Sequence, residues 1–324
     1  MVTWIGVDIA SDRFVAAQRL GPKLVHRSFR MTSSGFAAWR RWIAPTQAEL
    51  RICLESTGPY WRPLAAWLEK HEIPYALANP RKVRRFAQAS QHRSKTDPID
   101  AEILLRFAET FQLLPTSPLD PAYRQLRAVS RRILQLQLQL DTERDRADKA
   151  AVDPATPTSV RDSCRHIQQT LQQTLDQLED EACRLIGAHP RMCQQWELLL
   201  SITSIGPKTA RTLIAEYADL LGVASPRQMT RYAGLDIVLH ESGNSVRKHP
   251  RISKQGNWRL RRALYLACLS GIVHNPTLHS FYQRKLHAGI PKKQALVATM
   301  RKLIHLCFGV LNNQTPFHTQ TQMT

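Results

Sequence analysis

Four carboxylates stand at positions where folding could bring them together. Asp8 interrupts the apolar run WIGVDIA, and Glu55 ends the run ICLE just before the turn residues STGP. Asp97 and Asp100 both lie in SKTDPIDAEIL, spaced so that they can project from one face of a helix start. Hard cations such as Mg²⁺ prefer oxygen ligands, and paired ions can stabilise the attacking and leaving oxygens of phosphoryl transfer. The four acids therefore predict a Mg²⁺ site for that chemistry.

Each acid taken alone also has a simpler structural interpretation. Asp8 could be a hydrogen-bonded or turn-facing acid, and Glu55 could be a cap. Asp97 could be the N-cap of a helix whose first residue is Pro98. The metal interpretation rests on the four together and on Asp8, because a carboxylate in an apolar strand is costly unless a cation or hydrogen bonds compensate it.

The charge balance indicates a polyanionic partner. The chain has 45 Lys and Arg against 26 Asp and Glu, a net charge of +19 and a pI near 10.2, which favours nucleic acid. Residues 79–96 are rich in Lys and Arg, lack acids and directly precede the Asp pair, so they would steer a polyanion towards it. The contacts expected there are Arg81, Arg84, Arg85 and Lys95, and a solvated basic helix face is the alternative.

A second candidate for chemistry is a serine in the segment 240–265, which has seven Lys or Arg and one acid and which we interpret as an irregular loop leading into a helix. A serine that attacks a phosphate needs an exposed hydroxyl and cations for the developing charge. The chemistry alone does not choose among Ser242, Ser245 and Ser253, and for each of them a turn or cap hydroxyl is the alternative. The nucleic-acid contacts expected here are Arg247, Arg251, Lys254 and Arg261.

The elements that would position the acids follow a recognisable order. Residues 3–30 predict three short strands, 33–43 a helix, ELRICLEST a strand, YWRPLAAWLEKH a helix and PYALAN a further strand. An antiparallel meander that leads into helix-linked strands is typical of an α/β domain of the ribonuclease H type.

The middle of the chain predicts long helices. From 122 to 150 apolar residues recur at heptad spacing, DPATP interrupts the pattern at 153–157, and a second helical run follows from 158 to 187. We interpret this seam as favouring oligomerisation, and an intramolecular helical hairpin is the alternative.

Beyond residue 195 the chain predicts a basic helical region that opens with SITSIGPKTA. This run resembles a helix-hairpin-helix element, which presents backbone amides and here Lys208 to a nucleic-acid phosphate. Ser204 stands where that motif has its first glycine, so Gly206 alone is expected to supply the unusual backbone angles. An ordinary packing corner between two helices is the alternative.

Compartment signals favour the cytosol. The chain opens on an apolar strand without a secretory signal, its six cysteines never approach CxxC spacing, and no stretch reaches the roughly 20 uninterrupted apolar residues of a membrane helix. No membrane partner is expected.

The motifs GVDIA, LESTGPYW, SKTDPIDA, SITSIGPKTA, YAGL, HESGNSVR, ISKQGNWRLRRALY and MRKL, taken together and in this order, resemble one family. It is the family of DEDD-type transposases, which includes pilin-gene invertases and the bridge-RNA-guided recombinases of insertion sequences. The resemblance spans about residues 3–316 and is weakest between about 120 and 190. Ser204 and Ile237, which stands where relatives often have proline, depart from the family pattern.

The resemblance implies a RuvC-like, ribonuclease H-like catalytic domain at 1–118, a coiled coil or helical hairpin at 119–190, and a mainly α-helical transposase domain at 191–324. It implies that the DEDD metal ligands are Asp8, Glu55, Asp97 and Asp100, with Mg²⁺ as cofactor, and that the nucleophile is Ser242. It also implies double-stranded target and donor DNA, a noncoding guide (bridge) RNA, and dimers that join into a tetramer in the bacterial cytoplasm, at the nucleoid.

Two other classes of function fit parts of the pattern. A metal-only nuclease resembling a Holliday-junction resolvase would use the same carboxylates and need no serine. A protein that only binds and shapes DNA or RNA would need neither.

Overall fold

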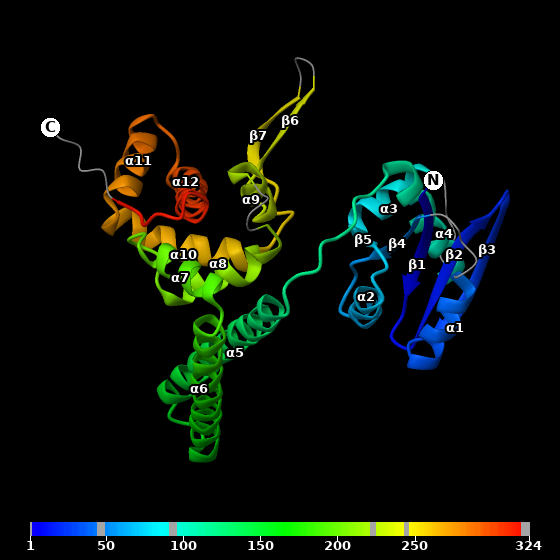
Figure 1. Ribbon diagram of the computed structural model, residues 1–324. Helices are drawn as coiled ribbons and strands as arrows, with labels where there is room; N and C mark the ends of the chain where they lie inside the picture. Colours follow the sequence, from blue (N-terminus) through cyan, green and yellow to red (C-terminus); the bar gives the residue numbers. More distant parts are fainter. Residues whose placement is uncertain (1, 44–48, 91–95, 221–224, 243–245, 319–324) are drawn as a thin grey trace. The chain divides into compact units, whose positions relative to one another are not determined.

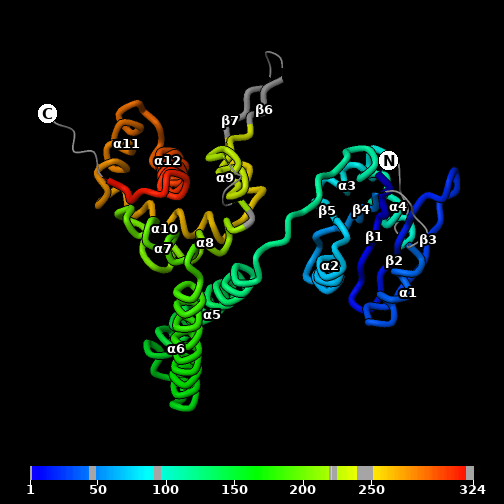
Figure 2. Tube along the Cα trace, viewed as in Figure 1, coloured from blue at the N-terminus to red at the C-terminus, as the bar shows by residue number. Residues whose placement is uncertain are grey.

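A computed structural model of the chain describes residues 2–43, 49–90, 96–220, 225–242 and 246–318. By its internal contacts the chain divides into two compact units, Met1–Pro118 and Leu119–Thr324. Figures 1 and 2 show both units. The segment 119–190 and the region 191–324 both fall within the second unit.

The first unit is built on a mixed five-stranded sheet with the order β3-β2-β1-β4-β5. Its first three strands form an antiparallel meander, β4 runs parallel to β1, and β5 runs parallel to β4. The strands are β1 (Val2–Ile9), β2 (Arg13–Leu20), β3 (Lys23–Arg30), β4 (Glu49–Glu55) and β5 (Tyr75–Ala78). The predicted order of elements is confirmed, and this sheet is compatible with a ribonuclease H-like domain.

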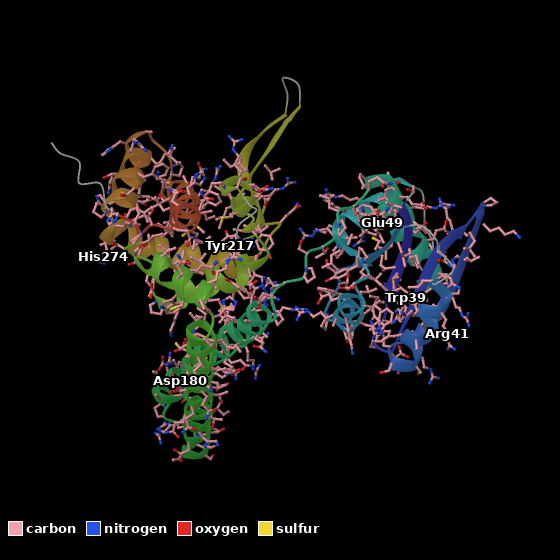
Figure 3. The ribbon with its side chains drawn as sticks, in the orientation of Figure 1. Trp39, Arg41, Glu49, Asp180, Tyr217 and His274 are labelled. Carbon is pink, nitrogen blue, oxygen red and sulfur yellow. The ribbon has the colours of Figure 1, made fainter. Side chains whose placement is uncertain are left out.

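Helices cover both faces of this sheet, because successive strand residues point to opposite sides. One face packs on α1 (Ser33–Ile43) and α2 (Trp61–Lys70), in a core that holds the fully buried side chain of Trp39, labelled in Figure 3. The other face packs on α3 (Pro80–Ala89) and α4 (Asp97–Phe111) in a separate core. The sheet is therefore the middle of three layers.

Gly6 in β1 allows α4 to approach the sheet down to backbone contact. A Cβ at this position would lie 2.1 Å from the carbonyl oxygen of Ala101 and 2.3 Å from the amide nitrogen of Leu105. Real Cβ atoms do not come so close to other atoms, so only glycine fits without moving the helix. The tight contact fixes α4 along the strand that carries Asp8.

The second unit begins with a helical hairpin of α5 (Pro121–Val152) and α6 (Thr158–Gly187), which pack against each other. The seam of α5 is buried within this unit, at Leu126, Ile133, Leu136 and Leu140. The alternative of an intramolecular helical hairpin is therefore confirmed, and oligomerisation stays a prediction. Two apolar stripes joined by a short turn meet in one chain before a second chain can compete.

The rest of the second unit is a compact group of helices that shares one core with the hairpin. Tyr217, labelled in Figure 3, is among its largest fully buried side chains. The elements are α7 (Pro190–Leu200), α8 (Pro207–Tyr217), the 3-10 turn η1 (Ala218–Leu220), α9 (Pro226–Tyr232), β6 (Ile237–Ser242), β7 (Val246–Ile252), α10 (Trp258–His274), α11 (Pro276–His287) and α12 (Lys292–Asn313).

The basic segment that follows α9 differs from its prediction. It is an antiparallel β-hairpin of β6 and β7 rather than an irregular loop. The residues SGN at 242–244 suit a turn, but the flanking strands carry charged residues on both sides, so the apolar alternation of a half-buried strand is missing.

One helix among the described residues, α12, is long and apolar enough to cross a membrane by length and composition. Its apolar side chains, among them Leu303, Ile304 and Cys307, are buried in the core of the second unit. Such burial is typical of the core helix of a folded domain.

The turn before α8 also differs from its prediction. Ser204, rather than Gly206, has the unusual backbone angle, with a φ of 107°, whereas Gly206 is extended at φ −88°. The hydroxyl of Ser204 is also buried, and no described atom forms a hydrogen bond with it. The positive φ stores strain at this turn, because left-handed backbone is costly for any residue with a Cβ. The buried hydroxyl adds the cost of a hydrogen bond that is not formed.

Replacing Gly6 with alanine is expected to destabilise the first unit by at least about 2 kcal/mol, because the new methyl group collides with the backbone of α4. The measurement is urea unfolding followed by circular dichroism. Gly187→Ala is the matched control, since a Cβ there meets nothing within 4 Å. Equal stability of the Gly6→Ala and Gly187→Ala variants would contradict the close contact.

Replacing Ser204 with glycine is expected to stabilise the second unit by about 1 kcal/mol, since it relieves the positive φ and removes the buried hydroxyl. The corresponding rise in Tm is about 2 to 4 °C, measurable by calorimetry. Ser201→Gly, at a φ of −63°, is the control and should lower Tm. A lower Tm for Ser204→Gly would show that the turn is unstrained.

Candidate functional site

The alternation of strand residues puts Asp8 and Glu55 on the same face of the sheet. Trp4 in β1 and Cys53 in β4 belong to the core beneath α4. Asp8 and Glu55 lie an even number of residues further along the same two strands, so they also face α4. The register pairs Val7 with Leu54, so the two acids follow at adjacent positions of parallel strands.

Asp97 and Asp100 lie in the first turn of α4. The N-cap is Thr96, whose backbone is extended and whose carbonyl accepts the hydrogen bond from the amide of Asp100. Asp97 is therefore the first helical residue, and its alternative role as the N-cap is wrong. Because Gly6 holds Ala101 and Leu105 against β1, the first turn of α4 lies beside Asp8.

The electrostatics of Asp8 show that the other three acids lie close enough to act on it. Burial raises the pKa of Asp8 from 3.8 to about 6, with further increases from the negative charges of Asp100, Asp97 and Glu55. The amide of Ile9 opposes this by hydrogen bonding. Bringing these carboxylates together therefore costs free energy that a cation would offset.

Two neighbours engage the outer acids. Arg13 of β2 forms an ion pair with Asp97 at 3.3 Å, and the hydroxyl of Thr57 donates to Glu55. Sequence reasoning missed Arg13, although its place directly after the SD turn could have suggested it. Both members of the Arg13 pair are well exposed, so we expect the pair to exchange readily with solvent or ligand.

Among the described residues, no group of three or more acidic, histidine or cysteine side chains is arranged closely enough to hold a metal ion. The donor set still suits a hard divalent cation, because it is entirely carboxylate oxygen and because burial, with added repulsion from the other three acids, raises the pKa of Asp8. The side chains thus fit such an ion by chemistry and charge, and closing on it would require rotamer changes.

The basic residues ahead of α4 form one exposed helix face. In α3, Arg81, Arg84 and Arg85 are exposed while Val83 packs into the core, and Asn79 caps the helix through its side chain. Lys95 lies outside the described residues. This helix carries no acid, so its positive face is uncompensated along its own length.

The candidate nucleophile Ser242 is the last residue of β6 and pairs with Val246 of β7. In the register of the same hairpin, Arg247 of β7 lies opposite Glu241 of β6. The side chains of Ser242 and Arg247 are not among those that the structure describes, and Ser245 lies outside the described residues. The third candidate, Ser253, donates its hydroxyl hydrogen bond to Asp236, as expected for a turn residue.

The base of the hairpin is held by close backbone packing. Arg261 donates to the carbonyl oxygens of Ala233 (2.9 Å) and Gly256 (3.3 Å), so this predicted nucleic-acid contact also braces the turn. Lys254 adopts a left-handed φ of 51° there. Both Lys254 and Arg251 have exposed side chains.

A buried ion pair connects this base to the helical hairpin, and the sequence pattern did not reveal it. Glu216 in α8 is 1% exposed and accepts two 2.7 Å hydrogen bonds from Arg131 of α5 and one from Asn257, the N-cap of α10. Burial pulls the pKa of Glu216 upward, but the hydrogen bonds and charge of Arg131 outweigh it and leave that pKa below its usual value. The pair fixes where α10 begins.

Comparison with known proteins finds two family matches. A family of DEDD type, described as Transposase, matches residues 5–157, and the family described as Transposase IS116/IS110/IS902 matches residues 196–283. The pilin gene-inverting proteins of Moraxella bovis and Moraxella lacunata are each 29% identical over 319 residues, 97% of both chains. An uncharacterised insertion element IS110 protein of Streptomyces coelicolor is 27% identical over 143 residues, 44% of this chain and 34% of its own length.

Removing the charge of Asp8 is expected to stabilise the metal-free protein. At pH 7 the Asp8→Asn variant should gain on the order of 1 to 2 kcal/mol, after allowance for solvent screening of this partly exposed group. Because the folded-state pKa is raised, wild-type Asp8 takes up its proton as the pH falls through about 6, so the advantage should shrink towards pH 4. Unfolding in urea at several pH values measures this.

Asp12→Asn is the matched control, since it removes one exposed carboxylate from the turn after β1. Adding Mg²⁺ should raise the Tm of the wild type and of Asp12→Asn but not that of Asp8→Asn. An equal response of all three proteins to Mg²⁺ would rule out the carboxylates as the binding site.

Proposed function

Because this chain belongs to the IS116/IS110/IS902 family of transposases and is a DNA transposase or recombinase, we propose that it exchanges strands through a covalent phosphoserine intermediate. The observation that carries the proposal is the gathering of four carboxylates against β1 and α4, which a merely architectural nucleic-acid-binding protein would not need.

The carboxylates of Asp8, Glu55, Asp97 and Asp100 would hold a divalent cation, and we propose Mg²⁺. Such an ion, when bound, lowers the cost of the negative charge that develops on phosphate and leaving oxygens. Asp8 would be the central ligand of the set, since it lies in the sheet and each of the other three acids lies close enough to act on it. Arg13 pairs with Asp97 at the surface and would release it on ion binding.

Ser242 would be the nucleophile. Its Oγ forms a bond to a DNA phosphorus and loses its proton, while the bond from that phosphorus to the oxygen of the leaving strand breaks and that oxygen takes up a proton. Attack by a strand end then reverses the step and releases the serine. The position of Ser242 at the end of β6, in a hairpin rich in Lys and Arg, supports this role through the charge available to the phosphate.

The partners that we propose follow from the positive net charge of the chain and from its family. The basic residues Arg81, Arg84, Arg85, Lys208, Arg251 and Lys254 would contact nucleic-acid backbones, and a noncoding guide RNA would supply the sequence choice by base pairing. Dimers would join into a tetramer for strand exchange. The relatives that match along their whole length are named for inverting a pilin gene, so inversion as well as insertion falls within the proposed reaction.

Membership of a transposase family accords with a soluble cytoplasmic protein. We propose that the protein associates there with the nucleoid, since its charge of +19 favours binding to DNA.

A metal-only nuclease is the second candidate, because the carboxylates gather independently of any serine. The two functions predict different products. A recombinase leaves a denaturation-resistant adduct between protein and DNA, whereas direct attack by water leaves none.

Replacing Ser242 with alanine is expected to abolish that adduct, measured by gel shift after denaturation, and to reduce strand cleavage at least about 1000-fold. Ser245→Ala, three residues further along the chain, is the control and should retain the adduct. Asp8→Asn should lose cleavage while DNA binding is retained. Abundant cleavage by Ser242→Ala would favour the metal-only nuclease. Loss of the adduct only in Ser245→Ala would identify Ser245 rather than Ser242 as the nucleophile.

A further inference from the structure

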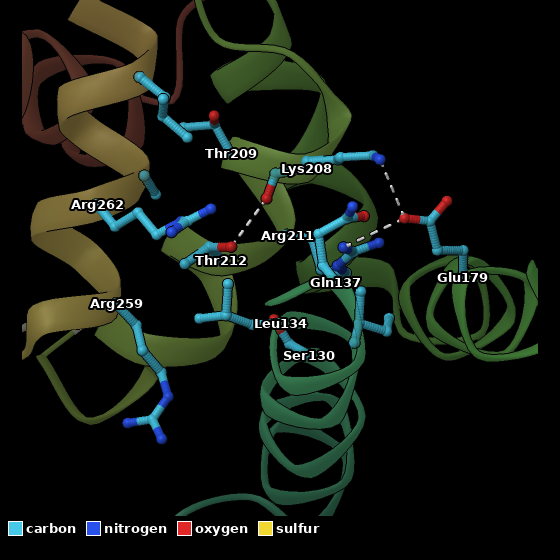
Figure 4. A pocket seen from close by; sticks show the side chains of 13 residues that line it. Ser130, Leu134, Gln137, Glu179, Lys208, Thr209, Arg211, Thr212, Arg259 and Arg262 are labelled. Atoms are coloured by element: carbon cyan, nitrogen blue, oxygen red, sulfur yellow. Dashed lines mark hydrogen bonds and ion pairs between the residues drawn. The ribbon is translucent and has the colours of Figure 1, made fainter. Parts of the chain in front are cut away.

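The second unit contains a pocket that the proposed chemistry does not use. It lies between α5, α6, α8 and α10, as Figure 4 shows, and the apolar part of its lining includes Ile133, Leu134 and Leu266. The polar part of its lining is dominated by cations, namely Lys208 and Arg211 from α8 and Arg259 and Arg262 from α10.

The positive charge in this pocket is only partly balanced. Glu179 of α6 is the one acid in its lining, and it serves two cations at once, 3.6 Å from Lys208 Nζ and 3.8 Å from Arg211 Nη2. Outside the lining, Asp141 lies 3.9 Å from Arg262. These separations are longer than good charge-assisted hydrogen bonds, so the cations keep donor capacity for another anion.

Two guanidinium groups in the pocket have buried donors without partners. The side chain of Arg211 is only 8% exposed, and no described atom accepts a hydrogen bond from its Nε. The Nε of Arg259 is likewise buried, without an acceptor among the described residues. Burial lowers the pKa of Arg211 against the opposing pull of Glu179, as expected for a cation that its surroundings do not fully compensate.

The start of α8 adds to this preference for anions. Lys208 and Thr209, in the first turn of the helix, both line the pocket. The N-cap is Gly206, which has no side chain that could cap the helix. The positive end of the helix dipole at this start favours an anion, and the buried Arg211 side chain lies one turn further along the same helix.

From these features we infer that the pocket binds the sugar-phosphate backbone of a nucleic-acid strand, with the phosphate held by Lys208, Arg211 and Arg262. The sugar would lie on the apolar part of the lining, a surface that inorganic phosphate would leave unused. The inference rests on the proposed function for the presence of nucleic acid and adds a binding site outside the carboxylates and the serine hairpin. DNA and RNA share this backbone chemistry, and the experiment separates them.

The test compares two charge-matched double variants in a Ser242→Ala background, so that binding is measured apart from cleavage. Lys208→Gln with Arg262→Gln removes the two more exposed cations of the pocket, with side chains 71% and 40% exposed. The control, Arg146→Gln with Arg165→Gln, removes two exposed cations from α5 and α6, 63% and 69% exposed. Thermal melting checks that both variants fold.

Fluorescence anisotropy then measures Kd for a DNA duplex and for an RNA strand of matched length over a range of salt concentrations. The pocket variant should bind at least one of them about tenfold more weakly, with the slope of log K against log salt reduced by about 2, while the control changes little. Loss confined to DNA or to RNA identifies the strand that the pocket holds. Equal changes in both double variants, or none, would overturn the inference, even if the Ser242 adduct forms as proposed.

Discussion

The contact between α4 and β1 at Gly6 is the constraint on which the candidate catalytic site depends. No side chain separates the two backbones there, so the helix cannot slide along the strand without a steric clash. This places the first turn of α4, with its two acids, beside Asp8, while the parallel register of β1 and β4 brings Glu55 to the same face. The tight backbone contact thereby keeps the negatively charged side chains close together.

That concentration is unfavourable by itself and is placed in a strongly basic protein. The raised pKa of Asp8 reflects its burial and its repulsion by the other three acids, and the exposed cations of α3 follow β5 in the same unit. The second unit has the reverse arrangement, in which cations outnumber acids around the α8 pocket and the serine hairpin. A divalent cation would compensate the first arrangement, and phosphates would compensate the second.

Sequence reasoning succeeded where periodicity or placement decides the structure. The strands and helices of the first unit followed from apolar alternation and turn residues, and the position of Asp8 in an apolar strand followed in the same way. It failed where the outcome depends on distant packing. The α5 seam could not distinguish a partner chain from α6, the hairpin of β6 and β7 lacks an apolar face, and only the fold shows that Ser204 has the positive φ. The buried pair of Arg131 and Glu216 joins residues far apart in the chain, so no local pattern indicates it.

The central claim is that Asp8, Glu55, Asp97 and Asp100 form one divalent-cation site. Crystals soaked in Mn²⁺, which replaces Mg²⁺ at oxygen ligands, would test it directly through anomalous scattering. We expect an anomalous peak within coordination distance of the Asp8 carboxylate and of acids from both β4 and α4. A well-ordered first unit without a peak at Asp8, at Mn²⁺ concentrations that support cleavage in solution, would contradict it.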